Sequence, residues 1–209
     1  MKLVFATHNH GKIREMASIL ADLAIDVVSA DEAGVTKDVE EDGSTLEENA
    51  LKKAKYVAHE THEWVIADDT GLFIDALGGA PGIHSNRWAG EQVKGNKLAE
   101  YTLQQMLKIP ADKRSGNFTS VVVVVAPGGK HWTFQGKLKG TIAPSPRGTP
   151  RPLLPYDTIF IPEGERRTFA EMSESEKNAI SHRGRAFEGI KKFLEERLKV
   201  DNKDYEVPR

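Results

Sequence analysis

The chain has 209 residues, of which 39% are hydrophobic and 29% charged, a composition typical of a globular protein and not of a disordered one. Its 29 Lys and Arg residues nearly balance its 31 Asp and Glu residues, so it lacks the basic excess expected of a protein that binds long nucleic acid. Because it contains no cysteine, disulfides, thiolate chemistry and cysteine-ligated zinc are excluded.

Apolar segments are short throughout the sequence. The most apolar run, at residues 121–126, is far shorter than the roughly 20 residues that a bilayer-spanning helix needs. The N-terminal run at residues 3–6 is cut off by polar residues 7–10, well short of the apolar core of a signal peptide. We therefore expect buried strands at both places, no membrane segment and a cytoplasmic protein.

Strands and helices alternate in the N-terminal third of the chain. Hydrophobic periodicity predicts, in chain order, a strand at 2–6, a helix at 11–22, a strand at 25–29, a helix from residue 44 and a strand at 64–67. A capping box formed by Ser44 and Glu47 is expected to start the second helix. Its inner face is expected to carry Leu46, Ala50, Ala54, Val57 and Ala58.

The remainder of the chain adds a hairpin and a long final helix. The predicted elements are a helix at 96–108, strands at 118–126 and 130–137 joined by a Pro-Gly-Gly turn, a strand at 158–161 and a helix at 182–198. This order predicts an α/β fold with a mixed sheet and flanking helices. No linker divides the chain, so we expect one catalytic domain over residues 1–199 and a polar tail over 200–209.

A candidate phosphate site lies where the first strand meets the first helix. Thr7, Asn9 and Lys12 place a hydroxyl, an amide and a cation at a helix N-terminus, where anions bind favourably. The segment lacks the spacing of the common phosphate-binding loop. The alternative, which the segment alone favours, is an ordinary turn at Asn9 and Gly11 followed by a solvated Lys12.

Two pairs of acidic residues form a candidate metal site. Asp68 and Asp69 follow a predicted strand, at the edge where open α/β sheets place ligands. Glu40 and Glu41 lie in a loop ahead of the second helix. Carboxylate oxygens are the ligands that Mg²⁺ prefers, and a carboxylate can also take a proton from an attacking water. The alternative is that these acids are exposed side chains beside helix N-termini.

A third cluster opens the final helix. Lys177, Ser181, His182 and Arg183 combine a hydroxyl cap, an imidazole and two cations, which can hold a phosphate or the edge of a base. The alternative is a capped helix with a basic first turn on the surface.

Taken in order, these segments resemble the inosine triphosphate pyrophosphatase family, enzymes that hydrolyse ITP, dITP and XTP. The matching segments span nearly the whole chain: Thr7-x-Asn9-x-x-Lys12, Glu40-Glu41-x-Gly43, Glu48-Asn49-Ala50, Lys53-Ala54, Ala67-Asp68-Asp69-Thr70-Gly71-Leu72, residues 77–83, Tyr156-Asp157 before Phe160, and Ser181-His182-Arg183-Gly184. The resemblance implies an elongated fold with two lobes around a central cleft, a nucleoside triphosphate as the small-molecule substrate, and a homodimer.

The resemblance also implies roles for individual residues. Asp69 is expected to be the general base and a metal-linked carboxylate. Mg²⁺ is the expected cofactor, held by Asp69 and by Glu40 or its neighbour Glu41, with Asp68 as a further candidate. The residues expected to bind the substrate are Thr7, Asn9, Lys12, Thr70, Leu154, Tyr156, Asp157, Lys177, His182 and Arg183.

Different parts of the substrate are expected to meet different members of this set. Thr7, Asn9 and Lys12 are expected at the triphosphate, and His182 and Arg183 near the 6-keto edge of the purine. A hydrogen-bond donor there pairs with a keto oxygen but not with the amino group of adenine. Water is expected to attack the α-phosphorus, with cations offsetting the charge on the leaving pyrophosphate.

One loop departs from the family pattern. The family has Gly-Phe-Gly before Tyr156, with the phenylalanine on the purine, whereas this chain has Leu154 at the aromatic position and Pro155 at the second glycine. Leucine lacks aromatic stacking geometry, and proline removes an amide donor. We therefore expect an altered base affinity or preference, with Arg151 as a candidate for a new substrate contact.

Two alternatives remain at the level of the sequence. The first is a pyrophosphatase with another nucleotide preference, because the base-pocket loop is altered. The second is a nucleotide sensor that binds without hydrolysing, against which the complete set of carboxylates argues.

Overall fold

The computed structural model describes residues 1–90 and 92–203. Its helices and strands are, in chain order, β1 (Lys2–Phe5), α1 (His10–Ile19), β2 (Asp26–Ser29), α2 (Leu46–Thr61), β3 (Trp64–Ile74), β4 (Pro81–Gly82), α3 (Asn96–Gln105), β5 (Ser115–Val125), β6 (His131–Ile142), β7 (Phe160–Pro162), α4 (Glu174–Ile180) and α5 (His182–Lys203). Residues 204–209 of the expected tail lie outside the described residues.

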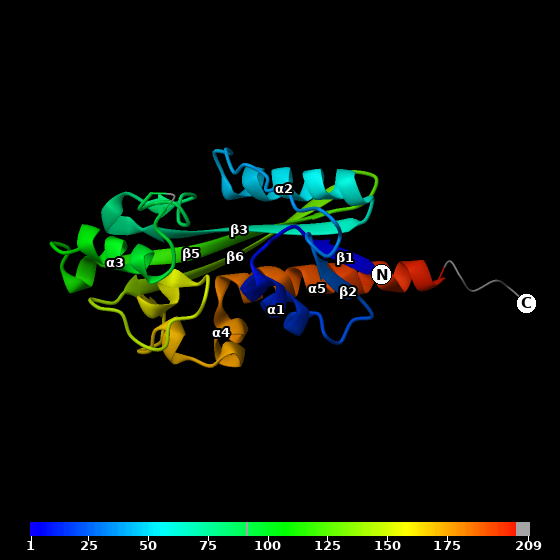
Figure 1. Cartoon of the computed structure of the whole chain (residues 1–209). Coiled ribbons are helices and arrows are strands. Elements are labelled where there is room, and N and C mark those ends of the chain that lie inside the picture. The colour runs from blue at the N-terminus through cyan, green and yellow to red at the C-terminus, as the bar shows by residue number, and fades with distance from the viewer. Residues whose placement is uncertain (91, 204–209) are drawn as a thin grey trace, which may run out of the picture.

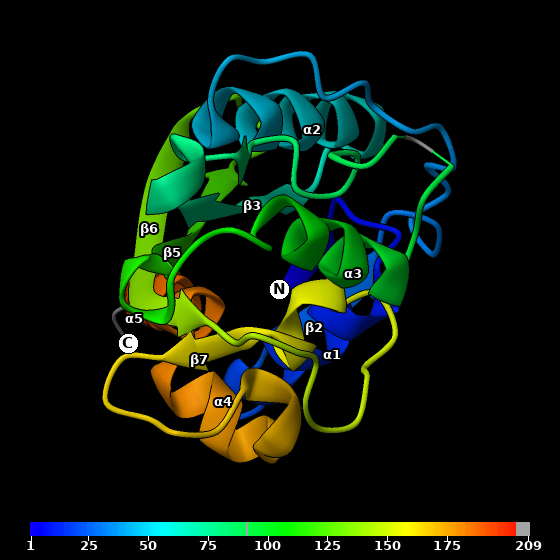
Figure 2. The ribbon, with the colours of Figure 1, turned by 90° about the vertical axis from the view of Figure 1, so that its left-hand side faces the viewer.

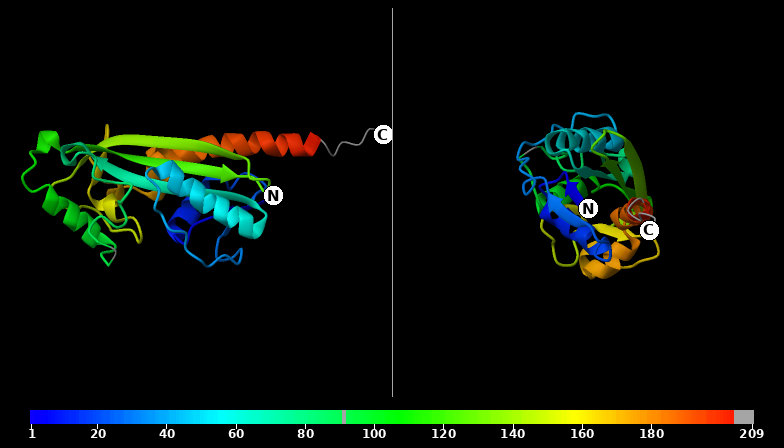
Figure 3. Two further views of the ribbon diagram at one scale, coloured as in Figure 1. Left: turned by 90° about the horizontal axis from the view of Figure 1, so that it is seen from above. Right: turned by 90° about the vertical axis from the view of Figure 1, so that its right-hand side faces the viewer.

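A single mixed sheet forms the centre of the molecule. Its strand order is β2-β1-β3-β5-β6-β7, with β4 paired to the far end of β3. β1 is parallel to β2 and β3, whereas β3, β5, β6 and β7 pair antiparallel. The expected mixed α/β sheet is therefore confirmed. The long strands β3, β5 and β6 run along an elongated molecule, and α5 lies beside them and projects past their end (Figures 1 and 3).

Helices cover both faces of this sheet (Figure 2). On one face, α2 packs Ala50, Ala54 and Val57 against β3 and β5. On the other, α1 and α5 pack a second apolar cluster that includes Met16 and Phe187. The apolar run in β5 is continuous because alternate valines face these two layers.

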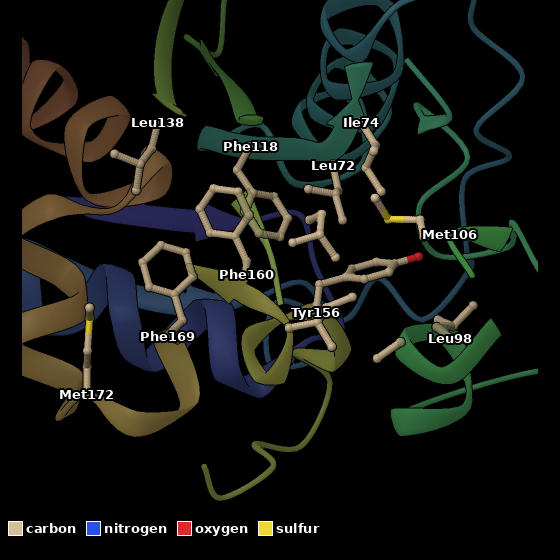
Figure 4. Packing of buried hydrophobic residues seen from close by; sticks show 13 residues of the cluster. Leu72, Ile74, Leu98, Met106, Phe118, Leu138, Tyr156, Phe160, Phe169 and Met172 are labelled. Atoms are coloured by element: carbon tan, nitrogen blue, oxygen red, sulfur yellow. The ribbon is translucent and has the colours of Figure 1, made fainter. Parts of the chain in front are cut away.

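A third apolar cluster fills the end of the molecule that holds α3 and β7 (Figure 4). Phe118 of β5 lies against Phe160, with ring centroids 4.7 Å apart, and close to Phe169. Tyr156 enters the same cluster from the turn before β7, and its hydroxyl donates to the Ser85 carbonyl at 2.6 Å. This packing fixes the segment that carries the predicted base-binding loop.

Several predicted boundaries differ from the structure. β3 does not end at residue 67 but runs to Ile74, because its partner β5 continues beside it as far as Gly116. The N-cap of α2 is Thr45, whose hydroxyl accepts from the Glu48 amide, one residue later than the predicted capping box. No helix in the described part of the chain combines the length and apolarity needed to cross a bilayer.

Candidate active site

The site forms at the point where β1 ends and the longer strand β3 continues beyond it. β1 pairs with β3 only from Leu3 to Phe5, and the Ala6 amide then donates to the Ile66 carbonyl. Beyond this point β3 continues through Asp68 and Asp69, facing the loop that leads into α1. Because successive side chains of a strand point to opposite faces, these two carboxylates separate.

Asp68 lies on the α1 and α5 face, where cations surround it. Its carboxylate is 2.8 Å from Lys12 Nζ and 3.4 Å from Arg183 Nε, and it accepts from the Thr70 hydroxyl at 3.2 Å. Burial alone would raise the pKa of Asp68, but the charges of Lys12 and Arg183 hold it far below its usual value. Asp68 is therefore a fully compensated carboxylate.

Asp69 lies on the α2 face, and its environment is different. It is 3% exposed and accepts from the Asn49 side-chain amide at 3.0 Å and from the Thr70 backbone amide at 2.9 Å. None of the described residues forms an ion pair with it. Burial raises the pKa of Asp69, and although the charge of Lys53 opposes this, the charge of Glu41 adds to it, so the net shift is upward. Asp69 is therefore a buried carboxylate that lies near Lys53 without a direct ion pair to it.

The loop before α2 carries Glu40 and Glu41, which both line the cavity beside the end of β1 and the start of α1. Lys53 Nζ lies 2.6 Å from Glu41 and 2.8 Å from the Asp68 carbonyl, and Arg87 also contacts Glu41. Glu40 is exposed, and among the described residues none forms an ion pair with it. Glu41 is thus held by protein cations, whereas Glu40 keeps a free carboxylate.

In the turn before α1, the side chains of Thr7 and Asn9 accept hydrogen bonds from nearby backbone amides. Asn9 is the N-cap, and its Oδ1 accepts from the amides of Gly11 at 2.9 Å and Lys12 at 3.3 Å. Thr7 Oγ1 accepts from the Asn9 amide at 3.1 Å. These two helix amides are therefore occupied, so a phosphate would be met mainly by the Lys12 ammonium.

Buried charges link α1, α4 and α5. Glu15 of α1 accepts from Arg183 at 2.6 Å and from Lys177 at 3.2 Å, and Lys177 also donates to Asp157 at 2.9 Å. Glu15 was not among the site residues predicted from the sequence. Its position three residues after Lys12 puts both side chains on one face of α1, which was the available signal.

His182 at the start of α5 is a buried, neutral imidazole. Its ring stacks on Phe118 with centroids 4.5 Å apart and an interplanar angle of 14°. Neither ring nitrogen has a hydrogen-bond partner among the described residues. Burial, together with the charges of Arg183 and Lys177, lowers the pKa of His182 well below its usual value. Two unsatisfied polar atoms in a core are costly unless a ligand meets them.

Arg151 does not serve as a free substrate contact, and that hypothesis is wrong. Its guanidinium donates to Asp157 at 3.1 Å, to the Phe169 carbonyl at 2.8 Å and to the Met172 carbonyl. All three acceptors belong to the protein, so Arg151 anchors its loop to the segments around η4 (Phe169–Glu171).

Two adjoining cavities collect nearly all of the predicted residues. A larger cavity of about 740 Å³ is lined by polar residues that include Thr7, Asn9, Lys12, Glu40, Glu41, Lys53, Lys37, Arg87 and Lys94. A smaller cavity of about 60 Å³ is lined by residues that include Thr70, Phe118, Leu154, Tyr156, Asp157, Lys177, His182 and Arg183. Asp68 and Asp69 line neither cavity, and both are buried, whereas Lys12, Lys53 and Glu41, whose charges act on them, line the larger one.

The acids suit a hard divalent cation, but they do not form a complete cage for one. The described residues contain no group of three or more His, Asp or Glu side chains placed to hold a metal. Among the four acidic residues of the predicted metal site, Glu40 and Asp69 form no ion pair with the described residues. Mg²⁺ commonly takes one or two carboxylates and completes its shell with water and substrate phosphates, so carboxylates of this kind suit its donor preference.

Comparison with known proteins gives a consistent result. The model of the Ham1 family matches residues 3–193. The dITP/XTP pyrophosphatase of Geobacter sulfurreducens is 42% identical over 193 residues, covering 92% of this chain and 96% of its own, and that of Bacillus subtilis is 43% identical with the same coverage. A Ham1 protein from Coxiella burnetii superposes with a TM-score of 0.85 at 37% identity, covering 94% of this chain and 99% of its own.

Proposed function

Because this chain belongs to the Ham1 family, we propose that it hydrolyses non-standard purine nucleoside triphosphates (dITP, ITP and XTP) to the monophosphate and pyrophosphate. The resemblance noted in the sequence agrees with this family. Three similar bacterial proteins are named dITP/XTP pyrophosphatase, which is the activity proposed here.

The observation that carries this proposal is the pair of adjoining cavities. The smaller has an aromatic and aliphatic wall with a free imidazole, which suits a base. The larger is lined by lysines and an arginine, which suit a triphosphate. Asn9, Lys12 and Asn86 line both, so one molecule with an apolar and a polyanionic end can occupy the two together.

Asp69 is assigned as the general base. It takes a proton from a water that attacks the α-phosphorus, the bond between the α-phosphorus and the bridging oxygen breaks, and pyrophosphate leaves. Its raised pKa suits a base better than that of Asp68, which stays ionised and is occupied by Lys12 and Arg183. Lys12 and Lys53 offset the negative charge that develops on the phosphates.

Mg²⁺ is the proposed cofactor, with Glu40 and Asp69 as its protein ligands. When bound, it supplies positive charge to phosphate oxygens and to the leaving pyrophosphate. The free carboxylate of Glu40 supports its choice over Glu41, which is already paired with Lys53. Asp68 is left as a structural neighbour that positions Lys12.

His182 is proposed to read the base. A neutral imidazole can donate from one nitrogen to the 6-keto oxygen of hypoxanthine or xanthine, whereas the amino group of adenine offers no acceptor there. Arg183, held by Glu15 and Asp68, adds a second fixed donor group at the same wall.

The test is pyrophosphate release from ITP, dITP, XTP, ATP, GTP and dUTP with Mg²⁺ and with EDTA. Turnover of the inosine and xanthosine nucleotides that stops in EDTA supports the proposal. Turnover of another nucleotide would keep the chemistry and change the substrate. Binding of ITP without any turnover would favour the sensor.

The domain organisation, localisation and oligomeric state expected from the sequence are proposed as well. We propose that residues 1–199 act as one catalytic domain and that the enzyme is a cytoplasmic homodimer that binds neither a membrane nor long nucleic acid. The nearly balanced charge supports the last point. Light scattering on the purified protein tests the dimer, and a monomeric mass that persists at high concentration would refute it.

A further inference from the structure

A tight turn stands at the junction of the two cavities. The Leu154 amide donates to the Arg151 carbonyl at 3.2 Å, which closes a four-residue turn with Pro152 and Leu153 at its centre. Leu153 has φ of 62°. A proline followed by a residue with positive φ is the pattern of a type II turn, in which glycine or asparagine normally takes the third position.

Leucine is an unfavourable residue for that position. Its Cβ crowds the backbone at positive φ, so glycine in its place would remove strain. Among the described residues other than glycine, only Leu153 and His62 have positive φ, and His62 is the C-cap of α2, where such a conformation is common. Backbone strain of this kind persists where the surroundings hold it, and it gathers at ligand sites.

The surroundings of this turn do hold it. Arg151 fixes the first residue through its bonds to Asp157 and two backbone carbonyls. Pro152 and Pro155 restrict the backbone on either side. The turn is therefore preorganised, and its strained residue keeps its side chain in one place.

That place is the passage between the two cavities. Leu153 lines both of them, yet it is 57% exposed and one of two large apolar side chains with such exposure in the described residues. A nucleotide joins its base to its phosphates through the sugar, so a side chain at the passage faces the sugar. Burial of exposed leucine surface on the ligand is favourable in proportion to the area covered.

We propose that Leu153 is a substrate-binding residue, an apolar cover that the strained turn holds over the sugar and the adjoining edge of the base. This role rests on the proposed function of the two cavities as a nucleotide site. Leu153 would strengthen binding of nucleosides and nucleotides in general and leave binding of free pyrophosphate unchanged.

The experiment compares wild type, Leu153→Gly and the control Leu107→Ala, which trims the other exposed leucine away from both cavities. Calorimetry with Mg²⁺ measures the affinity for IMP and, separately, for pyrophosphate, and a thermal melt reports Tm. In Leu153→Gly we expect IMP to bind about three- to tenfold more weakly. Pyrophosphate affinity should be unchanged and Tm equal or slightly higher, since glycine relieves the strain.

Turnover supplies a second reading. KM for ITP and for dITP should rise by a similar factor in Leu153→Gly while kcat stays within about twofold, since the reacting phosphate is not touched. The control variant should match wild type in every measurement.

The outcomes separate this inference from the proposed function. Unchanged affinity for IMP in Leu153→Gly would overturn the inference while the function stands. Equal losses for IMP and pyrophosphate, or a clear fall in Tm, would make Leu153 a structural residue and overturn it as well. Failure of wild type to bind IMP or turn over any nucleotide would overturn the proposed function, and the inference with it.

Discussion

Asp68 and Asp69 are adjacent on β3, but their carboxylates lie on opposite faces of the sheet and in opposite electrostatic states. Asp68 contacts Lys12 at 2.8 Å and Arg183 at 3.4 Å, whereas Asp69 accepts hydrogen bonds only from uncharged groups among the described residues. Strand alternation thus places the Asp68 carboxylate in direct contact with two cations and the Asp69 carboxylate, the proposed general base, on the other face without such a contact. Their substitutions should therefore have different consequences.

Asp69→Asn should remove turnover and keep the fold. Asparagine has the same shape and can still accept from the Thr70 amide, although its own amide nitrogen then faces the Asn49 side-chain amide that donates to Asp69, and it cannot take a proton from water. Loss of a general base typically costs about 10²- to 10⁴-fold in kcat. Steady-state pyrophosphate release measures the effect, and Asp22→Asn, an exposed carboxylate paired with Lys191, is the control. A variant with near-wild-type kcat would refute the assignment of Asp69 as base.

Asp68→Asn should instead destabilise the protein. It leaves Lys12 without its ion-pair partner and deprives Arg183 of one of its two carboxylates. Breaking a buried ion pair from one side costs about 3–5 kcal/mol, which corresponds to a fall in Tm of roughly 6–20 °C for a chain of this size. Thermal melts measure this against Asp22→Asn, which should change little. A Tm equal to wild type would show that the cluster around Asp68 is not a stabilising unit.

The two substitutions should also differ in their dependence on pH. The pKa of Asp69 is raised by burial, so its contribution to stability is present below its unfolded pKa and lost as pH rises through the folded value. Without divalent cations, the stability of Asp69→Asn relative to wild type should therefore rise between about pH 3 and pH 7, because only the wild type loses this contribution. The pKa of Asp68 is lowered by Lys12 and Arg183, so its contribution is present above its unfolded pKa and lost in acid. The deficit of Asp68→Asn should be complete from pH 5 to 8 and shrink below about pH 4. Urea unfolding across this range checks both signs, and a deficit of the same size at every pH would contradict them.

Much of this architecture could be predicted from periodicity, because the strands and helices carry regular apolar patterns. The inner face of α2 and the hairpin of β5 and β6 were predicted in this way. The length of β3 was not, since Asp68 and Asp69 look like the end of a strand until β5 is known to pair beside them. Strand continuation depends on a partner that lies some fifty residues away in the sequence.

In the candidate active site, too, local motifs could be predicted from the sequence, whereas contacts between distant segments could not. Many of the residues that line the cavities were found through short motifs, but Arg87, Lys94 and Phe118 were not. The pairings were not predicted either, because ion pairs such as Glu15 with Arg183 join distant segments. Arg151 is the opposite case, in which the sequence suggested a role in substrate binding that the structure does not support. A basic residue in a substrate loop suggests a ligand contact, and only the folded chain reveals three protein acceptors around it.

His182→Phe should separate base recognition from stability. Phenylalanine keeps the stacking on Phe118 and removes two buried polar atoms that have no partner in the described structure, so Tm should stay the same or rise. We expect kcat/KM for ITP to fall about 10- to 100-fold, with a much smaller change for ATP. Competition assays with the two nucleotides measure the ratio, and His59→Phe on the surface is the control. An unchanged ratio of ITP to ATP would rule out His182 as the reader of the base.

Arg151→Met should loosen the base-pocket loop without touching the reacting groups. Methionine keeps much of the length of the side chain but leaves the carbonyls of Phe169 and Met172 without their donor, and Asp157 keeps only Lys177. A hydrogen bond from a charged group contributes about 1.5–3 kcal/mol to the free energy of unfolding. We therefore expect Tm to fall by several degrees.

The kinetic signature of Arg151→Met should be a rise in KM. Because Leu153, Leu154 and Pro155 lose their anchor while Asp69 keeps its environment, KM for ITP should rise about five- to tenfold with kcat nearly unchanged. Arg151→Lys should recover little, since an ammonium cannot match the planar fork that spans three acceptors. The exposed Arg166→Met serves as the matched control. A fall in kcat at constant KM would mean that the loop acts on the chemical step, and full recovery by lysine would mean that charge alone, not the fork, holds the turn.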